Sequence, residues 1–114
     1  MLGHQGEVRV EAAGEDVVVR CAGDIDHDLS PDLDQALRQA LKSAPVRTVV
    51  DLSEVRFADS AVLHSLLQAA REHQEADVQL VVAGPLGEVT RRLFEVTGSA
   101  EAFTFVDAPP SAHG

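Results

Sequence analysis

The sequence predicts an α/β fold: a mixed sheet with mostly parallel central strands, packed by helices. Short runs of β-branched residues alternate with longer segments in which apolar residues recur at helical spacing. This alternation is typical of parallel strands joined by helical crossovers. The first two strand-like runs are separated only by a short turn, which predicts a hairpin and therefore one antiparallel N-terminal edge strand. With 114 residues the chain has room for one domain with its own core.

The two strands of the hairpin differ in their hydropathy pattern. Residues 8–11 alternate apolar and polar side chains, as expected of a half-buried strand. Residues 14–16 supply the turn, and residues 17–22 form a nearly continuous apolar run that is typical of a buried strand. The lone Cys21 lies in this run; it has no cysteine partner for a disulfide, and we expect it to be a small core residue.

A helix and a central strand are expected next, after a short loop. Ser30 and Pro31 favour a helix start, since a serine hydroxyl can accept a hydrogen bond from a free N–H group and proline fits the first turn. Pro45 bars the helix from continuing. Residues 46–52 contain a β-branched run typical of a central strand, and residues 53–59 are expected to form a loop.

The remaining chain predicts two further helices and two further strands. One helix is expected over about residues 61–73, with His64 and His73 facing solvent because the apolar stripe lies elsewhere. The ordered core is expected to span about residues 7–107, and residues 108–114 to form a flexible tail. The other expected elements are a strand at residues 78–83, a helix at about residues 86–96 with Val89, Leu93 and Phe94 inward, and a strand at residues 103–106.

Composition excludes several classes of function. The net charge of −10 argues against direct binding of nucleic acid and against an anionic membrane surface, because both need clustered Lys and Arg. It favours encounter with a basic protein surface. No apolar run approaches the length of a membrane span, and the first residues lack a signal-peptide pattern. Together with the lone Cys21, these features predict a cytoplasmic protein without membrane insertion.

Two segments are expected to meet at one edge of the sheet. Parallel strands carry loops and helix starts at their carboxyl ends, where α/β sheets usually bind ligands, and residues 23–29 and 57–62 both fall there. Asp24, Asp26 and Asp28 have a spacing that suggests calcium, but the loop lacks the glycine and the closing glutamate of an EF-hand, so we expect solvated carboxylates. No Cys–His pattern for zinc is present. The sequence therefore predicts no metal site and no cofactor.

Three segments resemble one known family. Residues 49–60, Val-Val-Asp-Leu-Ser-Glu-Val-Arg-Phe-Ala-Asp-Ser, resemble the signature of the STAS domains of anti-sigma-factor antagonists, in which a strand ending in Asp-Leu leads to an Asp-Ser pair at a helix start. Residues 23–27, Gly-Asp-Ile-Asp-His, are similar to the family's Gly-Glu-Leu-Asp-His segment, and residues 89–98 are similar to its third helix. The resemblance covers residues 8–106 and implies a single STAS domain over residues 1–114, a binding module and not an enzyme.

The resemblance implies a partner-switching pathway controlled by phosphorylation. Antagonists of this family bind an anti-sigma factor that is also a serine kinase of the histidine-kinase ATPase fold, and binding releases a sigma factor for transcription. The kinase phosphorylates the serine after the aspartate, which ejects the antagonist, and a phosphoserine phosphatase restores it. By position Ser60 is the phosphoacceptor. The residues expected to bind the partner are Asp24, Asp26, His27, Asp59, Ser60, Ala61, Val62 and His64.

The segment after Ser60 departs from the family pattern. The family reads Ser or Thr and then Gly-Leu-Gly, whereas this chain has Ala61, Val62, Leu63 and His64. Glycine lets a partner backbone approach closely, and Val62 and His64 are expected to add bulk at that surface. The departure supports an alternative function, an STAS adaptor that is not phosphorylated and serves a transporter ATPase or a signalling scaffold.

Simpler roles are also open to these residues. Ser60 has the position of a plain N-cap, and Asp59 can neutralise the dipole of the helix. A small α/β enzyme acting through Ser60 and His64, which have i, i+4 spacing, is a third hypothesis. It is the weakest of the three, because no acid is placed to orient the imidazole and no oxyanion donors can be assigned.

Overall fold

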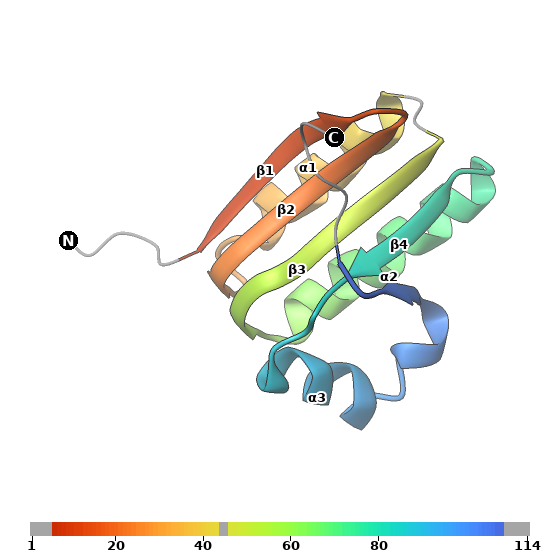
Figure 1. Cartoon of the computed structure of the whole chain (residues 1–114). Coiled ribbons are helices and arrows are strands. Elements are labelled where there is room, and N and C mark those ends of the chain that lie inside the picture. Colours follow the sequence, from red (N-terminus) through yellow and green to blue (C-terminus); the bar gives the residue numbers. More distant parts are fainter. Residues whose placement is uncertain (1–5, 44–45, 109–114) are drawn as a thin grey trace.

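Five strands form one mixed sheet, and α1 and α2 pack against one of its faces (Figure 1). The structure, a computed structural model, describes residues 6–43 and 46–108. The strand order is β1-β2-β3-β4-β5; β1 pairs antiparallel with β2, and the other neighbouring pairs are parallel. This architecture confirms the predicted fold class. The elements are β1 (Glu7–Ala13), β2 (Asp16–Ile25), α1 (Ser30–Lys42), β3 (Arg47–Ala58), α2 (Ser60–Glu75), β4 (Gln79–Ala83), α3 (Glu88–Val96), a 3₁₀ turn (Ala100–Ala102) and β5 (Thr104–Val106).

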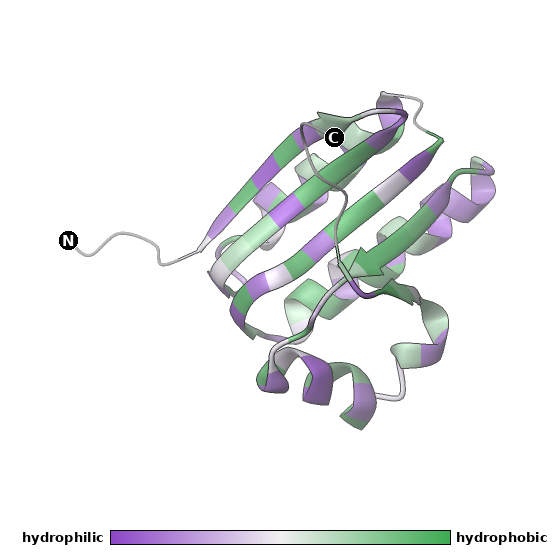
Figure 2. Ribbon diagram, viewed as in Figure 1, coloured by the Kyte–Doolittle hydropathy of each residue, from purple (hydrophilic) through white to green (hydrophobic). Residues whose placement is uncertain are grey.

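Alternate residues of β2 and β3 face opposite sides of the sheet. Val19 and Val50 belong to the main core on the side of α1 and α2, and both are fully buried. Val18 and Val49 belong to a second apolar cluster on the other side and are also fully buried. Both faces of the central strands are therefore apolar at these positions, and the green segments of β2 and β3 in Figure 2 are interrupted by purple, hydrophilic ones.

Cys21 lies in the main core, as predicted, with 1% of its surface exposed. Burial, and to a lesser extent the negative charge of Asp51, raises the pKa of the Cys21 thiol to about 12. Because the thiolate is the reactive form of cysteine, this thiol is chemically inert at neutral pH while the chain is folded.

The largest difference from the expected fold lies in β3, which continues to Ala58 instead of ending at Leu52. The loop that the sequence predicts at residues 53–59 is wrong for all of them except Asp59. The extension carries the strand directly to the start of α2.

Two irregularities keep the long β3 paired with β2. One lies between Arg20 and Ala22 and the other between Gly23 and Asp24, and β3 has one extra residue at each. At the second, Gly23 has a φ of 79°, a left-handed conformation that glycine adopts without strain. Hydropathy patterns assume a regular alternation of the two faces, which a bulge interrupts. The sequence therefore predicts a loop where the strand continues through a bulge.

The helix starts also differ from the expected ones. In α1 the N-cap is Leu29 and not Ser30, whose hydroxyl donates to the carbonyl of His27 at 3.1 Å. In α3, Val89 was expected to point inward, but 48% of its surface is exposed. This helix lies beyond the carboxyl end of β4 (Figure 1), so only a narrow stripe of it meets the other elements. Pro45 and residues 109–114 of the expected tail lie outside the described residues.

The expectation that His73 faces solvent is wrong, because its side chain is buried between α2 and β3. Its Nδ1 lies 2.8 Å from the carbonyl oxygen of Ala69, and its Nε2 lies 2.8 Å from Oγ1 of Thr48. A carbonyl oxygen can only accept, so Nδ1 carries the proton and Nε2 accepts from the threonine hydroxyl. Burial lowers the pKa of His73 below 6.5, against smaller opposing effects of the Ala69 hydrogen bond and of Glu72.

This lowered pKa predicts an acid-sensitive fold. Below pH 6.5 the unfolded chain binds a proton at His73 that the folded chain does not bind, so the free energy of unfolding falls as pH decreases towards the folded-state pKa. Urea unfolding at several pH values between 7.5 and 5 gives the free energy of unfolding as a function of pH. The slope of this plot should be steeper for wild type than for His73→Gln by up to about 1.4 kcal/mol per pH unit. His64→Gln replaces an exposed histidine of the same helix and is measured alongside as the matched variant. Equal slopes for wild type and His73→Gln would contradict the prediction.

Candidate functional site

The candidate site lies at the carboxyl ends of β2 and β3, where the two expected segments do meet. Ile25 and Ala58, the last residues of the two strands, are direct neighbours in the sheet. Immediately beyond them, the backbone N–H of His27 donates to Oδ2 of Asp59 at 3.0 Å. One hydrogen bond therefore joins the loop after β2 to the start of α2.

Asp59 is the N-cap of α2. Its Oδ1 accepts from the backbone N–H groups of Ala61 and Val62 at 3.0 and 3.4 Å. Its other oxygen accepts from His27, as described above, so one carboxylate caps the helix and holds the neighbouring loop. The idea that Ser60 is the cap is wrong, since a residue with extended backbone is needed there and Asp59 has it, with a ψ of −177°.

Ser60 is the first residue of α2, and its side chain is exposed. Because Asp59 already satisfies the first free N–H groups of the helix, the Ser60 hydroxyl is not required for capping. It is therefore a surface hydroxyl in the first position of a helix that Asp59 caps. Another protein can therefore contact this hydroxyl, because the residue is exposed.

The acidic residues at the end of β2, which the sequence predicts as loop from Gly23, and in the loop after it have different local partners. Asp26 is half-buried, and its Oδ1 accepts from the N–H of Asp28 at 3.0 Å. Asp24 lies 3.4 Å from the guanidinium of Arg56 at the end of β3. His27 is exposed, and its Nδ1 lies 3.8 Å from Oδ2 of Asp59. In the described part of the chain, no three His, Cys, Asp or Glu side chains are arranged to hold a metal ion.

The first turns of α2 contain one further correction. Val62 is only 3% exposed and packs in the main core, so the expectation that it adds bulk at a partner surface is wrong. Ala61 is half-buried, whereas His64 is exposed on the next turn. Of the two bulky residues that replace the family's glycines, only His64 changes the surface that a partner meets.

Sequence reasoning missed Phe57 as a surface residue. Its side chain is 45% exposed although it lies within β3, three positions before Ser60. The second bulge lies at Arg56 and breaks the alternation of β3, so the face on which Phe57 lies cannot be predicted from a regular strand pattern. The available signal was the position of Phe57 directly before the Ala-Asp-Ser segment. Hydropathy alone assigns a phenylalanine to the core.

Removing the carboxylate of Asp59 should destabilise the protein and free the loop at His27. For Asp59→Ala we expect the free energy of unfolding to fall by about 1–2 kcal/mol, the usual cost of losing an N-cap. Asp59→Asn keeps one oxygen for the cap and should cost less, so the difference between the two variants isolates the contribution of capping. Urea unfolding measures both, and Asp32→Ala, an exposed acid in the first turn of α1 without a capping role, is the control. An equally large loss of stability in Asp32→Ala would show that charge, not capping, is responsible.

Comparison with known families agrees with this geometry. A family model described as "Mlab, STAS domain" matches residues 8–106, which is nearly the whole described chain. The chain belongs to the STAS domain family. The prediction made from the three motif-like segments is therefore confirmed.

Solved structures of similar fold include anti-sigma factor antagonists. An anti-sigma factor antagonist from Mycobacterium paratuberculosis is 29% identical, with a TM-score of 0.80 over 90% of this chain and 86% of that protein. SpoIIAA in its unphosphorylated form is 17% identical, with a TM-score of 0.75 over 89% of each chain. The phosphorylated form of SpoIIAA, a cell fate determinant of Bacillus, is 18% identical, with a TM-score of 0.68 over 89% of this chain and 92% of that one.

Two general properties of this STAS domain follow. Antagonists of the family are regulatory proteins without enzymatic activity, which agrees with the prediction that the chain is not an enzyme. None of the helices within residues 6–43 and 46–108 combines the length and the hydropathy needed to cross a membrane.

Proposed function

We propose that this STAS domain is an anti-sigma-factor antagonist of a cytoplasmic partner-switching pathway. It binds an anti-sigma factor with serine kinase activity while Ser60 is unmodified, and phosphorylation of Ser60 releases it. A phosphoserine phosphatase returns it to the binding form, and transcription is regulated through the sigma factor that binding sets free. The observation that carries the proposal is the exposed hydroxyl of Ser60 beside the capping carboxylate of Asp59.

The arrangement of the cap explains how phosphorylation acts as a switch. The N–H groups of Ala61 and Val62 already bind Asp59, so they are not free to draw a phosphate into the helix end. The modified side chain stays at the surface with about −1.5 to −2 charges, next to the carboxylate of Asp59. The fold is retained, because the positive end of the helix dipole tolerates the new charge. An interface built for a neutral hydroxyl at this position is lost.

The partner surface has a definable chemistry. The acids of the loop after β2 favour a basic partner, and the exposed ring of Phe57 supplies an apolar contact near Ser60. Aromatic residues surrounded by polar ones are frequent centres of protein interfaces. Together with Asp24, Asp26, His27 and His64 on the surface, these residues form the proposed docking site; Ala61 contributes its backbone and its half-buried side chain.

The test is phosphorylation by an anti-sigma kinase from the same genome. Purified protein is incubated with the kinase and ATP, and the modified position is identified by peptide mass spectrometry. One phosphate on Ser60 is expected, and none on Ser60→Ala. The protein also contains Ser65, which is buried in α2, so modification there would report unfolding. Complete absence of phosphate on Ser60, with a kinase that modifies its own cognate antagonist, would contradict the proposal.

An STAS adaptor that is never phosphorylated is the second candidate, and the exposed His64 favours it. The imidazole stands on the surface where the family has a glycine that lets a partner approach closely. His64→Gly separates the two functions: it should strengthen binding to an anti-sigma kinase, but weaken binding to a partner selected for the histidine. Binding of a purified transporter ATPase that depends on His64 would favour the adaptor.

A further inference from the structure

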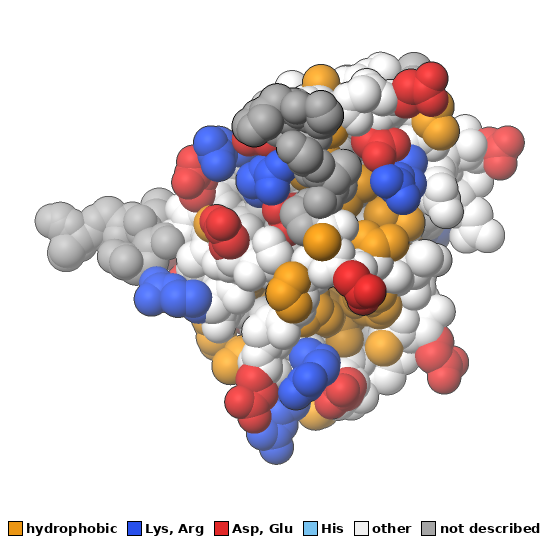
Figure 3. All heavy atoms as spheres, viewed as in Figure 1, with side chains coloured by type: hydrophobic (Ala, Val, Ile, Leu, Met, Phe, Trp, Pro, Cys, Tyr) orange, Lys and Arg blue, Asp and Glu red, His pale blue; other side chains and the backbone are white. Residues whose placement is uncertain are grey.

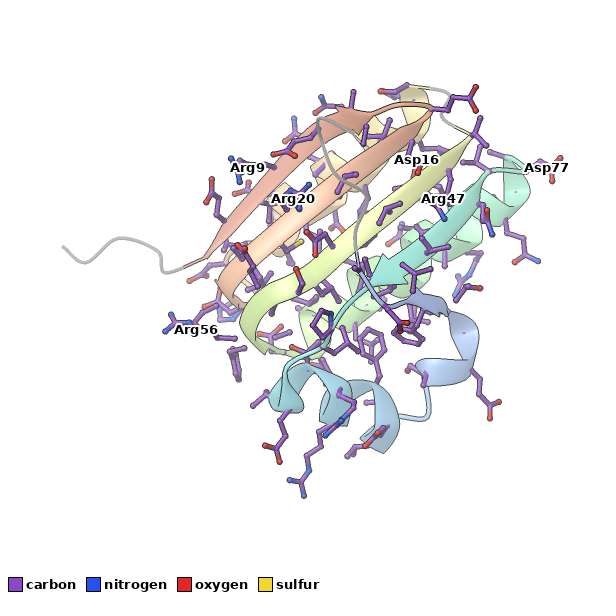
Figure 4. All side chains as sticks on the ribbon, in the orientation of Figure 1. Arg9, Asp16, Arg20, Arg47, Arg56 and Asp77 are labelled. Atoms are coloured by element: carbon purple, nitrogen blue, oxygen red, sulfur yellow. The ribbon has the colours of Figure 1, made fainter. Side chains whose placement is uncertain are left out.

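A buried carboxylate lies on the face of the sheet opposite α1 and α2. Asp51 of β3 is only 1% exposed, and its Oδ2 accepts from Nη1 of Arg20 at 2.6 Å. The same guanidinium donates through Nε to Oε1 of Glu11 at 3.1 Å. The three side chains join β1, β2 and β3. Figure 3 shows acidic and basic side chains close together over this part of the sheet, and Figure 4 shows Arg20 midway along β2.

The carboxylate also holds the first bulge of β3. Oδ1 of Asp51 accepts from the backbone N–H of Ser53 at 2.9 Å and from its hydroxyl at 2.7 Å. Arg20 pairs with Asp51 in the sheet, and the next pair is Ala22 with Glu54. The extra residue of β3 therefore lies just after Asp51. One oxygen of Asp51 binds Arg20 on β2, and the other binds Ser53 within the bulge.

The bulge determines where the candidate site lies. Shifting the register of a strand by one residue turns each later side chain to the opposite face. After the first bulge, Val55 points into the main core. A second bulge at Arg56 then brings Ala58 beside Ile25, and the next residue, Asp59, accepts from the His27 N–H.

We propose that Arg20 and Asp51 are positioning residues for the phosphoacceptor end of the domain. They act from the helix-free face, through the bulge, on Asp59 and hence on Ser60. Without Arg20 the buried carboxylate loses its charged partner, which strongly disfavours the arrangement that holds the bulge. The consequence for phosphorylation rests on the proposed function, whereas the consequence for the geometry of Asp59 does not.

The sheet contains a matched control pair. Asp16 and Arg47 are neighbours on the same two strands, and Arg47 Nη2 donates to Asp16 Oδ2 at 2.7 Å. Their side chains are 18% and 30% exposed, close to the 20% of Arg20. This pair lies at the opposite end of the strands (Figure 4), where the register is regular. Its removal should affect stability without moving the site.

The experiment compares Arg20→Met with Arg47→Met by ¹⁵N–¹H NMR. The amide signals of His27, Ala61 and Val62 report the three hydrogen bonds of Asp59. We expect these signals to shift and their hydrogen exchange to accelerate in Arg20→Met, while in Arg47→Met they stay as in wild type. Arg20→Lys, which retains the charge, should restore them in part. Equal effects of the two methionine variants, or unchanged site signals in Arg20→Met, would overturn the inference.

Two further measurements complete the test. If Arg20→Met does not fold, Asp51→Asn replaces it, with Asp16→Asn of the control pair as its control and the same expected contrast. With the kinase, kcat/KM for phosphorylation should fall about tenfold or more in Arg20→Met, since small misplacement of a reacting group has effects of this size, and change little in Arg47→Met. If wild type itself is not phosphorylated, the proposed function fails, and the amide signals still decide the role of Arg20.

Discussion

Ser60→Asp is expected to weaken binding of the anti-sigma factor by a factor of tens to thousands, while Ser60→Ala should bind persistently. The exposed hydroxyl lies beside the carboxylate of Asp59, which is already engaged in capping α2. A second carboxylate at this position carries a charge for which the interface has no partner. Unpaired charges in interfaces cost about 2–5 kcal/mol, and each 1.4 kcal/mol is about a tenfold change in affinity.

Ser60→Asn is the matched control, because asparagine has nearly the size of aspartate without its charge. Isothermal titration calorimetry with the purified anti-sigma factor gives the three dissociation constants, and urea unfolding should show that the variants differ by less than about 0.5 kcal/mol in stability. Equal weakening by Asn and Asp would mean that size at position 60 controls binding, and the electrostatic switch would be abandoned. Unchanged affinity of Ser60→Asp would place the docking surface elsewhere.

The order of the elements could be predicted from the sequence because it depends on local patterns. Apolar runs such as residues 17–22 and helical repeats such as that of α2 are set by which faces of an element are buried. The continuation of β3 to Ala58 could not, since it runs through two bulges at which β3 has one extra residue against β2. A bulge held from another strand leaves no periodic signal.

The roles of individual site residues were partly hidden for the same reason. Asp59 and Ser60 are both good capping residues, and the choice between them is decided by the additional hydrogen bond from His27 to Asp59. Val62 stands at a glycine position of the family pattern, yet its side chain packs in the main core. Burial of His73 depends on Thr48, which lies on a different element. Each error concerns a tertiary contact, whereas the two segments expected to meet do lie together at the carboxyl ends of β2 and β3.

Phe94→Ala is expected to lower the free energy of unfolding by about 3–5 kcal/mol, the usual cost of removing a buried phenylalanine side chain. Phe94 is 2% exposed and packs α3 against the segment that contains β5. Its ring makes edge-to-face contacts with Phe103 and Phe105, at centroid distances of 5.4 and 5.3 Å. These contacts contribute beyond the buried area alone. The chain has four phenylalanines and no Trp or Tyr, and three of the four form this cluster.

The fourth phenylalanine, Phe57, supplies the control for this prediction. Its ring is 45% exposed, so Phe57→Ala should cost well under 1 kcal/mol of stability, as surface substitutions usually do, and should instead weaken partner binding. Thermal unfolding distinguishes the two variants, because 1 kcal/mol shifts the midpoint of a domain of this size by roughly 4–8 °C. Phe94→Leu, with a smaller expected loss, keeps the comparison possible if Phe94→Ala is unfolded. Similar midpoints for the Phe94 and Phe57 variants would mean that the aromatic cluster does not hold α3 in place. A stability loss confined to Phe94, with a binding loss confined to Phe57, would separate the residues that maintain the fold from those that meet the partner.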